Sequence, residues 1–243
     1  MTLAIDIGNT RIKVGLFREN ELVQKETWEV LDLRAIKEIA YNQKIQNVIL
    51  CSVAEVSQTI EASFKEDFHY LQLTEKTPLP IKNLYQTPAS LGKDRLAAVV
   101  GAYHFQPGKN CLVIDAGSCI TFDLLNAKGE YLGGNISPGV EMRLKAMHHF
   151  TARLPKVERQ QTKSFLGRNT KSALQNGGQL GAVLETKAFI DLCKQNFRTL
   201  QILLTGGDAD FFAKRLKTKI FVHPNLVLEG LNKIMNYNVG LQE

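Results

Sequence analysis

Short apolar segments alternate with polar turns along the chain, and their spacing predicts both strands and helices. Apolar runs predict strands over about residues 2–7, 11–17, 21–30 and 48–53. The other elements predicted in this part are a helix opened by Asp32 and Leu33, an amphipathic helix over 56–67, a short strand near Tyr70, a proline-containing loop over 74–89 and a helix over 90–105.

The pattern restarts after Pro107 and Gly108. Strands are predicted over 111–115, 119–126 and 130–136, followed by a helix to about Phe150, a polar stretch over 151–169, a long helix over 171–197, a strand over 201–204, a helix, a strand over 220–222 and a last helix from about 225.

The order strand, strand, strand, helix, strand, helix therefore occurs twice, about 109 residues apart. We predict an α/β protein with two similar lobes, residues 1–108 and 109–243, each a mixed sheet with helices, and a cleft between them. Three glycines in the long helix, Gly177, Gly178 and Gly181, are expected to let another backbone or a ligand come close.

The composition limits which classes of protein the chain can belong to. A chain of 243 residues with 44% hydrophobic content can bury a core, and no apolar run approaches the roughly 20 residues of a membrane helix. The start of the chain shows no basic leader or cleavage site. The four cysteines, Cys51, Cys111, Cys119 and Cys193, are scattered without a CxxC pair, which predicts reduced thiols in a cytoplasmic protein.

The net charge is +6 and the sequence pI about 9.1, which fits either a nucleic-acid binder or a protein with anionic ligands. The densest basic stretch contains a single acid, Glu158, and we interpret most of its charges as a solvated loop. Its cations are Arg153, Lys156, Arg159, Lys163, Arg168 and Lys171.

Chemistry is indicated first by the turn Asp6-Ile7-Gly8-Asn9-Thr10-Arg11. We expect Gly8 to supply a positive φ and to let backbone N–H groups approach a phosphate, with Asn9, Thr10 and Lys13 as further donors. Asp6 could hold a hydrated Mg²⁺, because that ion takes few protein ligands. The alternative is an ordinary hairpin turn.

A second turn of the same kind, Asp115-Ala116-Gly117-Ser118, follows a strand in the other half of the chain. Two such turns favour a polyphosphate ligand over turn chemistry alone. A third segment, Thr205-Gly206-Gly207-Asp208, could let a nucleobase or ribose lie against backbone, or could be a plain loop with Asp208 as helix N-cap. Both interpretations stay open.

The order of these motifs resembles the superfamily of acetate and sugar kinases, heat-shock chaperones and actin. Together with LGKDR (91–95) and GGNISPGVEMR (133–143), the chain is similar to type III pantothenate kinases over about residues 2–235. The resemblance implies an actin-like ATPase duplication related to ribonuclease H. It also implies Mg²⁺ with ATP, a monovalent cation (K⁺ or NH₄⁺) and a homodimer.

The resemblance also implies roles for particular residues. Asp94 matches the proton acceptor, and Asp115 matches the site of the monovalent cation. Residues matching pantothenate contacts are Tyr85, Gly92, Lys93, Asp94, Arg95 and Thr170. Residues expected at ATP are Asp6, Gly8, Asn9, Thr10, Arg11, Lys13, Ser118, Gly206 and Gly207, with Ser118 standing where the family often has threonine.

The position of Asp94 suits this role independently of the resemblance. It lies in the first turns of the predicted helix, where the helix dipole favours an ionised carboxylate. Phosphoryl transfer depends on positioning and charge neutralisation, so such a carboxylate need only orient an alcohol and accept its proton late. Arg95 could hold the pantothenate carboxylate or a phosphoryl oxygen. The alternative is that Asp94 caps its helix and Arg95 is a surface charge.

We therefore expect an ATP-dependent kinase that converts pantothenate to 4′-phosphopantothenate, the first step towards coenzyme A. One alternative is a superfamily kinase or phosphatase acting on a sugar, another small alcohol or polyphosphate. A non-enzymatic alternative is an accessory regulator of transcription, since relatives of the family are described in that way. We expect no membrane partner and no nucleic acid.

Overall fold

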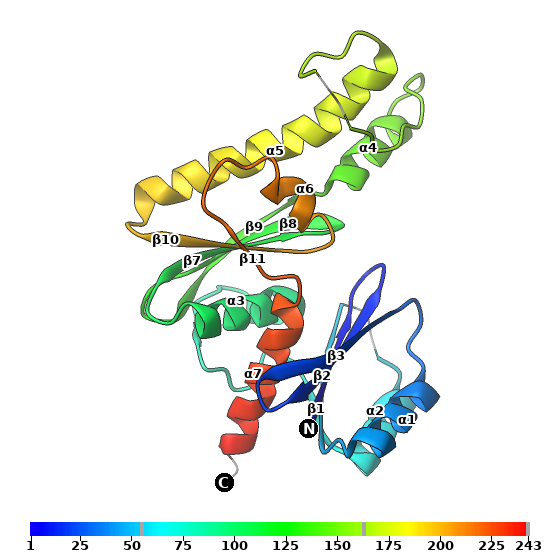
Figure 1. Ribbon diagram of the computed structural model, residues 1–243, viewed down its shortest axis with the longest axis vertical. Helices are drawn as coiled ribbons and strands as arrows, with labels where there is room; N and C mark the ends of the chain where they lie inside the picture. Colours follow the sequence, from blue (N-terminus) through cyan, green and yellow to red (C-terminus); the bar gives the residue numbers. More distant parts are fainter. Residues whose placement is uncertain (54–55, 162–163, 242–243) are drawn as a thin grey trace. The chain divides into compact units, whose positions relative to one another are not determined.

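The computed structural model describes residues 1–53, 56–161 and 164–241, which form two sheets with helices beside them (Figure 1). Lys163 of the basic stretch lies outside the described residues. Close contacts divide the chain into two compact units. Unit 1 comprises Met1–Lys109, Leu124–Gly133 and Asn225–Glu243, and unit 2 comprises Asn110–Asp123 and Gly134–Pro224.

The first sheet lies in unit 1 and has the strand order β3-β2-β1-β4-β5. β1 pairs antiparallel with β2 and parallel with β4, so the sheet is mixed, as predicted. Its strands are β1 (Thr2–Ile7), β2 (Ile12–Arg18), β3 (Glu21–Trp28), β4 (Asn47–Ser52) and β5 (His69–Gln72).

Successive side chains of β1 point to opposite faces of the first sheet. Leu3 and Ile5 are fully buried in a cluster with Ile36 of α1 (Leu33–Gln43) and Phe64 of α2 (Gln58–Asp67). Ala4 and Asp6 therefore point to the opposite face of the sheet. Asp6 is consequently placed away from the α1 and α2 core.

Two helices of unit 1 pack closely against each other: α3 (Lys93–Phe105) and α7 (Leu226–Gly240). A Cβ at Gly230 would lie 1.8 Å from the carbonyl oxygen of Ala97, and one at Gly101 would lie 2.6 Å from that of Leu226. The crossing therefore requires glycine on both helices. α7 also contacts β1, β2 and β4.

The second sheet has the strand order β11-β10-β7-β8-β9-β6. Its strands are β6 (Lys82–Asn83), β7 (Asn110–Ala116), β8 (Cys119–Leu125), β9 (Glu130–Pro138), β10 (Leu200–Thr205) and β11 (Phe221–Val222). Without β6, the order β9-β8-β7-β10-β11 repeats β3-β2-β1-β4-β5 strand for strand. The predicted duplication of an α/β unit is confirmed by this topology.

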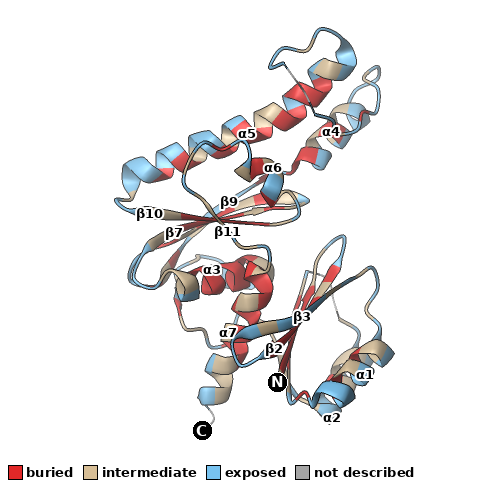
Figure 2. Ribbon diagram, viewed as in Figure 1, coloured by how far each residue is buried: buried red, intermediate tan, exposed pale blue. Residues whose placement is uncertain are grey.

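The helices of unit 2 are α4 (Val140–His149), α5 (Thr170–Asn196) and α6 (Ala209–Ala213). Of the three glycines predicted to allow close approach in α5, only Gly178 meets a neighbour, since its Cβ would lie 2.6 Å from Leu144 of α4. Gly177 and Gly181 have open space beside them. Figure 2 shows α5 with buried and exposed residues alternating along its length.

Two local predictions need adjustment. A 3-10 turn, η1 (Pro88–Ser90), occupies the predicted start of the third helix, so α3 begins only at Lys93. The predicted loop over 74–89 contains β6, because Lys82 and Leu84 donate backbone hydrogen bonds to the carbonyl oxygens of Gly129 and Tyr131. None of the described helices is long and apolar enough to cross a bilayer.

The contact-based units differ from the predicted lobes, 1–108 and 109–243, in the segments 124–133 and 225–243. Both segments belong to the compact unit that contains the N-terminal part of the chain. Residues 225–243 belong to unit 1 because α7 buries its apolar face on α3 and on the first sheet. The interlobe cleft stays a prediction.

Candidate active site

The first predicted phosphate turn, Gly8 to Arg11, connects β1 to β2 and is largely exposed. The backbone N–H of Gly8 donates to the carbonyl oxygen of Arg11 at 3.1 Å. The expected positive φ at Gly8 is wrong, since no residue of this turn has one. Glycine instead permits close approach, because a Cβ would lie 3.2 Å from the Arg11 oxygen.

Asp6 lies at the end of β1 and is 6% exposed. Its neighbours in the sheet are Lys13 of β2 and Cys51 of β4. A buried carboxylate thus stands beside a half-buried lysine, just ahead of the turn. This placement suits a carboxylate that orders water around an ion more than one that only braces a hairpin.

Asp94 is in the first turn of α3 and is half-buried. Its Oδ1 accepts the backbone N–H of Arg95 at 2.8 Å. A Cβ at Gly92 would lie 2.6 Å from the same oxygen, so glycine leaves room for the carboxylate beside the start of the helix. The sequence prediction that Asp94 lies within the first turns is confirmed.

Lys93 has a different environment from the one its predicted role suggests. Its Nζ donates to the carbonyl oxygens of Leu91 at 3.0 Å and Pro88 at 3.3 Å, and lies 3.9 Å from Glu75. The ammonium group therefore braces the 3-10 turn ahead of α3. Lys93 therefore stabilises the local conformation around Gly92, in addition to the positive charge that it could offer a ligand.

Asp6 and Asp94 belong to two elements, β1 and α3, that both contact β4, the strand of Cys51. Burial raises the pKa of Cys51 well above its usual range. The negative charges of Asp6 and then Asp94 raise this pKa further, while Lys93 opposes them. Two carboxylates 88 positions apart in the sequence are thus brought within electrostatic reach of one buried atom.

Arg95 follows Asp94 but points into protein, with 6% exposure. Its Nη2 donates to the hydroxyl oxygen of Tyr131 at 3.2 Å. The guanidinium carbon lies 5.8 Å from the centre of the Tyr85 ring. The alternative interpretation of Arg95 as a surface charge is wrong, and both predicted substrate residues, Tyr85 and Arg95, meet around Tyr131.

In unit 2, the second and third predicted turns come together. Asp115 and Thr205 are neighbours in the parallel pair β7–β10, and the backbone N–H of Asp208 donates to the Ala116 oxygen at 2.8 Å. Gly206 has a φ of +95°, and a Cβ there would lie 2.5 Å from Asp115 Oδ1 and 2.4 Å from the Ala116 oxygen. Gly206 is therefore required both by its conformation and by the oxygens beside it.

Asp208 occupies the N-cap position of α6 but makes no side-chain cap hydrogen bond. Its carboxylate instead pairs with Arg159. The guanidinium of Arg159 lies over the ring of Phe211 at 4.0 Å, and Arg215 lies over the same ring at 3.9 Å. Arg159 therefore joins the polar stretch 151–161 to the Thr205–Asp208 turn.

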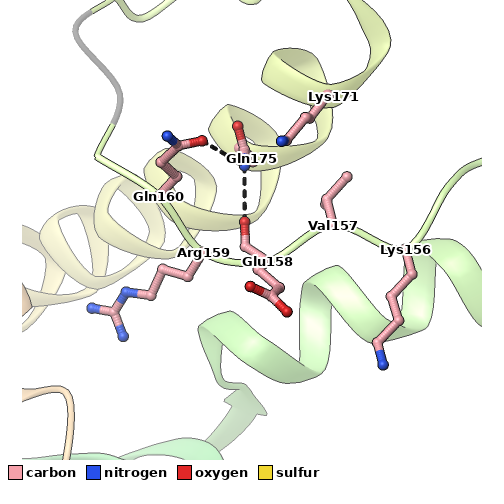
Figure 3. Close-up of a pocket in the computed structure, with 7 residues that line it drawn as sticks. All are labelled: Lys156, Val157, Glu158, Arg159, Gln160, Lys171 and Gln175. Carbon is pink, nitrogen blue, oxygen red and sulfur yellow. Dashed lines mark hydrogen bonds between the residues drawn. The ribbon is translucent and has the colours of Figure 1, made fainter.

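Thr170 and Ser118 are both exposed. Thr170 is the first residue of α5, which has a capping box in which Asn169 Oδ1 accepts the backbone N–H of Ser172 at 2.9 Å. A cavity of about 570 Å³ lies nearby (Figure 3), lined by Lys156, Val157, Glu158, Arg159, Gln160, Lys171 and Gln175. None of the sequence-predicted site residues lines it.

Oxygen atoms are the available ligands for the predicted ions. Asp115 Oδ1 and the Ala116 carbonyl oxygen both lie where a side chain on Gly206 would be, which suits a monovalent cation that binds oxygen. Within the described residues, no three His, Cys, Asp or Glu side chains gather as a metal site. Asp6 alone would offer Mg²⁺ one carboxylate, which fits an ion that keeps its waters.

Sequence reasoning did not single out Tyr131, Arg159 and Cys51, which lie beside Arg95, Asp208 and Asp6 respectively. Tyr131 is one aromatic in a strand pattern, and Arg159 is one of several cations in a stretch interpreted as solvated loop. Among the described cations of that stretch, Arg153, Lys156, Arg168 and Lys171 are exposed, as predicted, and Arg159 is not. Only contacts that are distant in sequence reveal these roles.

The duplicated sheet order and the paired Asp-x-Gly turns define an α/β protein with a duplicated, actin-like fold. A solved structure with this fold is the inorganic polyphosphate/ATP-glucomannokinase from Arthrobacter sp. strain KM. It is 15% identical with a TM-score of 0.51, and the match covers 100% of this chain and 99% of that one.

Closer relatives narrow the class to a family. The model of the type III pantothenate kinase family matches residues 2–191, and the chain belongs to that family. A type III pantothenate kinase from Bacteroides fragilis is 42% identical over 241 residues, which are 99% of each chain. A solved Campylobacter jejuni protein, assigned to the Baf family of transcriptional activators, is 25% identical with a TM-score of 0.64, covering 98% of this chain and 99% of that one.

Proposed function

We propose that the protein phosphorylates pantothenate with ATP, giving 4′-phosphopantothenate for coenzyme A synthesis. Family membership supports the substrate. The observation that carries the chemistry is that β4 pairs with β1 beside Asp6 and also contacts α3, whose first turn holds Asp94, so the phosphate turn and the candidate base belong to one region of unit 1.

In the proposed reaction, Asp94 orients the primary alcohol of pantothenate and accepts its proton. A bond forms between the alcohol oxygen and the γ-phosphorus of ATP, and the bond from that phosphorus to the ADP oxygen breaks. Asp94 lies in the first turn of α3, near the partial positive charge of the helix start. Tyr85, Gly92, Lys93, Arg95 and Thr170 would hold pantothenate.

The ATP phosphates would be held at the turn from Gly8 to Arg11, with Asp6 and Lys13 beside it, and ATP would also contact Ser118, Gly206 and Gly207. Mg²⁺ would neutralise charge on the phosphates and keep most of its waters near Asp6. Asp115 and the Ala116 oxygen would hold K⁺ or NH₄⁺. We place this reaction in the cytoplasm.

We also propose a homodimer that forms through α5. Gly177, Gly181 and Leu184 recur at spacings that put them on one face of this helix. The two glycines have open space beside them, and Leu184 is 55% exposed. An apolar face of this kind fits a second copy of the chain.

A coupled ATP assay with pantothenate, in K⁺ and in Na⁺ buffers, tests the proposal. We expect turnover that needs K⁺ and that falls by roughly 100-fold or more in Asp94→Asn, because the amide cannot accept the proton. Glu38→Gln, which changes an exposed carboxylate on α1, is the matched control and should retain wild-type turnover. Wild-type turnover in Asp94→Asn would refute the role of Asp94.

The name of the Campylobacter jejuni relative supports a second candidate, a regulator of transcription. The net charge of +6 is compatible with DNA as a ligand. Salt-dependent DNA binding without ATP turnover would favour this candidate. Preferential phosphorylation of a sugar, in a panel that includes pantothenate, would instead favour the sugar-kinase alternative.

A further inference from the structure

Tyr131 of β9 is fully buried in unit 1 and contacts two residues from an earlier part of the chain, Tyr85 and Arg95. β6 pairs in parallel with β9 so that Asn83 is the direct neighbour of Tyr131. The backbone N–H of Leu84 donates to the Tyr131 carbonyl oxygen at 3.0 Å. This short pairing delivers the next residue, Tyr85, to the Tyr131 side chain.

The rings of Tyr85 and Tyr131 stack with centres 6.0 Å apart and planes 14° from parallel. This distance lies within the range in which aromatic pairs attract each other. A Cβ at Gly133, which has a φ of +121°, would lie 3.7 Å from the Tyr85 ring. The position of Tyr85 is therefore set by the backbone of β6 and by stacking on the Tyr131 ring.

The hydroxyl of Tyr131 reaches the second motif. It accepts a hydrogen bond from Arg95 Nη2 at 3.2 Å, and the Arg95 side chain is buried. A guanidinium group has five donors in a fixed plane, so fixing one nitrogen restricts the direction in which the others point. The Tyr131 hydroxyl is one of the interactions that set the Arg95 orientation.

We propose that Tyr131 is a positioning residue of the acceptor site, whose ring orients Tyr85 and whose hydroxyl orients Arg95. This inference rests on the proposed function, since Tyr85 and Arg95 are its predicted pantothenate contacts. Tyr131 acts through these two side chains on the carboxylate-bearing acceptor. It makes no contact with ATP in this scheme.

Tyr131→Phe tests the hydroxyl, because phenylalanine keeps the ring and the stacking. We expect the KM for pantothenate to rise roughly tenfold, the effect of losing one hydrogen bond to a charged group, with the KM for ATP within twofold of wild type. Tyr103→Phe removes the hydroxyl of a tyrosine on α3 and should leave both KM values unchanged.

A double variant separates positioning from general damage. In an Arg95→Lys background, Tyr131→Phe should raise the KM for pantothenate by less than twofold, because the geometry that the hydroxyl fixes is already lost. Equal effects in both backgrounds, or equal increases in both KM values, would overturn the inference. The melting temperature of Tyr131→Phe should lie close to that of wild type.

Different results would contradict the positioning role of Tyr131 and the proposed function. If wild-type protein turns over pantothenate and Tyr131→Phe is indistinguishable from it, the positioning role is wrong and the function stands. If wild-type protein does not phosphorylate pantothenate at all, the proposed function is wrong and the inference falls with it.

Discussion

Arg159 belongs to a stretch of otherwise exposed cations, yet its guanidinium is held from two sides. It pairs with Asp208 and lies over the Phe211 ring. The pair is partly shielded from water, with 27% and 19% of the two side chains exposed. Both partners flank the glycine turn that we assign to ATP, so the orientation of that turn depends on one arginine.

Arg159→Ala should raise the KM for ATP about fivefold, since a partly buried charged hydrogen bond contributes about 1 kcal/mol or somewhat more. Arg215→Ala is a matched control, because Arg215 contacts the same ring of Phe211 and Asp208 pairs with Arg159. Steady-state kinetics with varied ATP would measure both variants. An equal increase in the two variants would show that stacking on Phe211, and not the ion pair, positions the turn.

The sequence predicted those candidate site residues that belong to a short local motif. Asp6, Asp94 and Asp115 each end a strand or begin a helix beside glycine, and this local pattern is visible in the sequence. Arg159 and Tyr131 acquire their roles from partners 49 and 36 positions away. No periodicity of the sequence encodes such a pairing.

At the scale of elements, the sequence predicted most strands and helices because apolar runs bounded by polar turns mark where they lie. β6 was missed because two residues are too few to show alternation, and its pairing depends on backbone groups near Gly129 and Tyr131. The apolar pattern of α7 predicted a helix, but it could not predict which sheet that helix covers.

The crossing of α3 and α7 gives a sharp prediction about stability. Gly230→Ala should destabilise the fold by about 3 kcal/mol or more, because its Cβ would lie 1.8 Å from a backbone oxygen that cannot rotate away. Urea unfolding followed by circular dichroism would measure the loss.

Gly240→Ala, at the end of the same helix, is the matched control. A Cβ there has nothing within 4 Å, so the substitution should change stability by less than about 1 kcal/mol, in the stabilising direction. Equal stability of both variants would mean that the two helices do not approach as closely as the structure shows.

For the whole molecule, the proposed homodimer depends on the exposed face of α5. Leu184→Glu would place a charge in the middle of this face, and we expect it to give monomers by light scattering, with reduced turnover of pantothenate. Tyr41→Glu changes an 88% exposed aromatic residue on α1 and should remain dimeric. A dimeric Leu184→Glu variant would move the interface elsewhere.

The return of the last helix to the first sheet has a consequence for how the protein is made. The ribosome synthesises α3 and strands β1, β2 and β4 long before α7 (residues 226–240). These elements nevertheless bury apolar surface against α7. The nascent chain must therefore carry an incomplete core around α3 and the first sheet until residues 226–240 have been synthesised, and until then this core is exposed to chaperones and proteases.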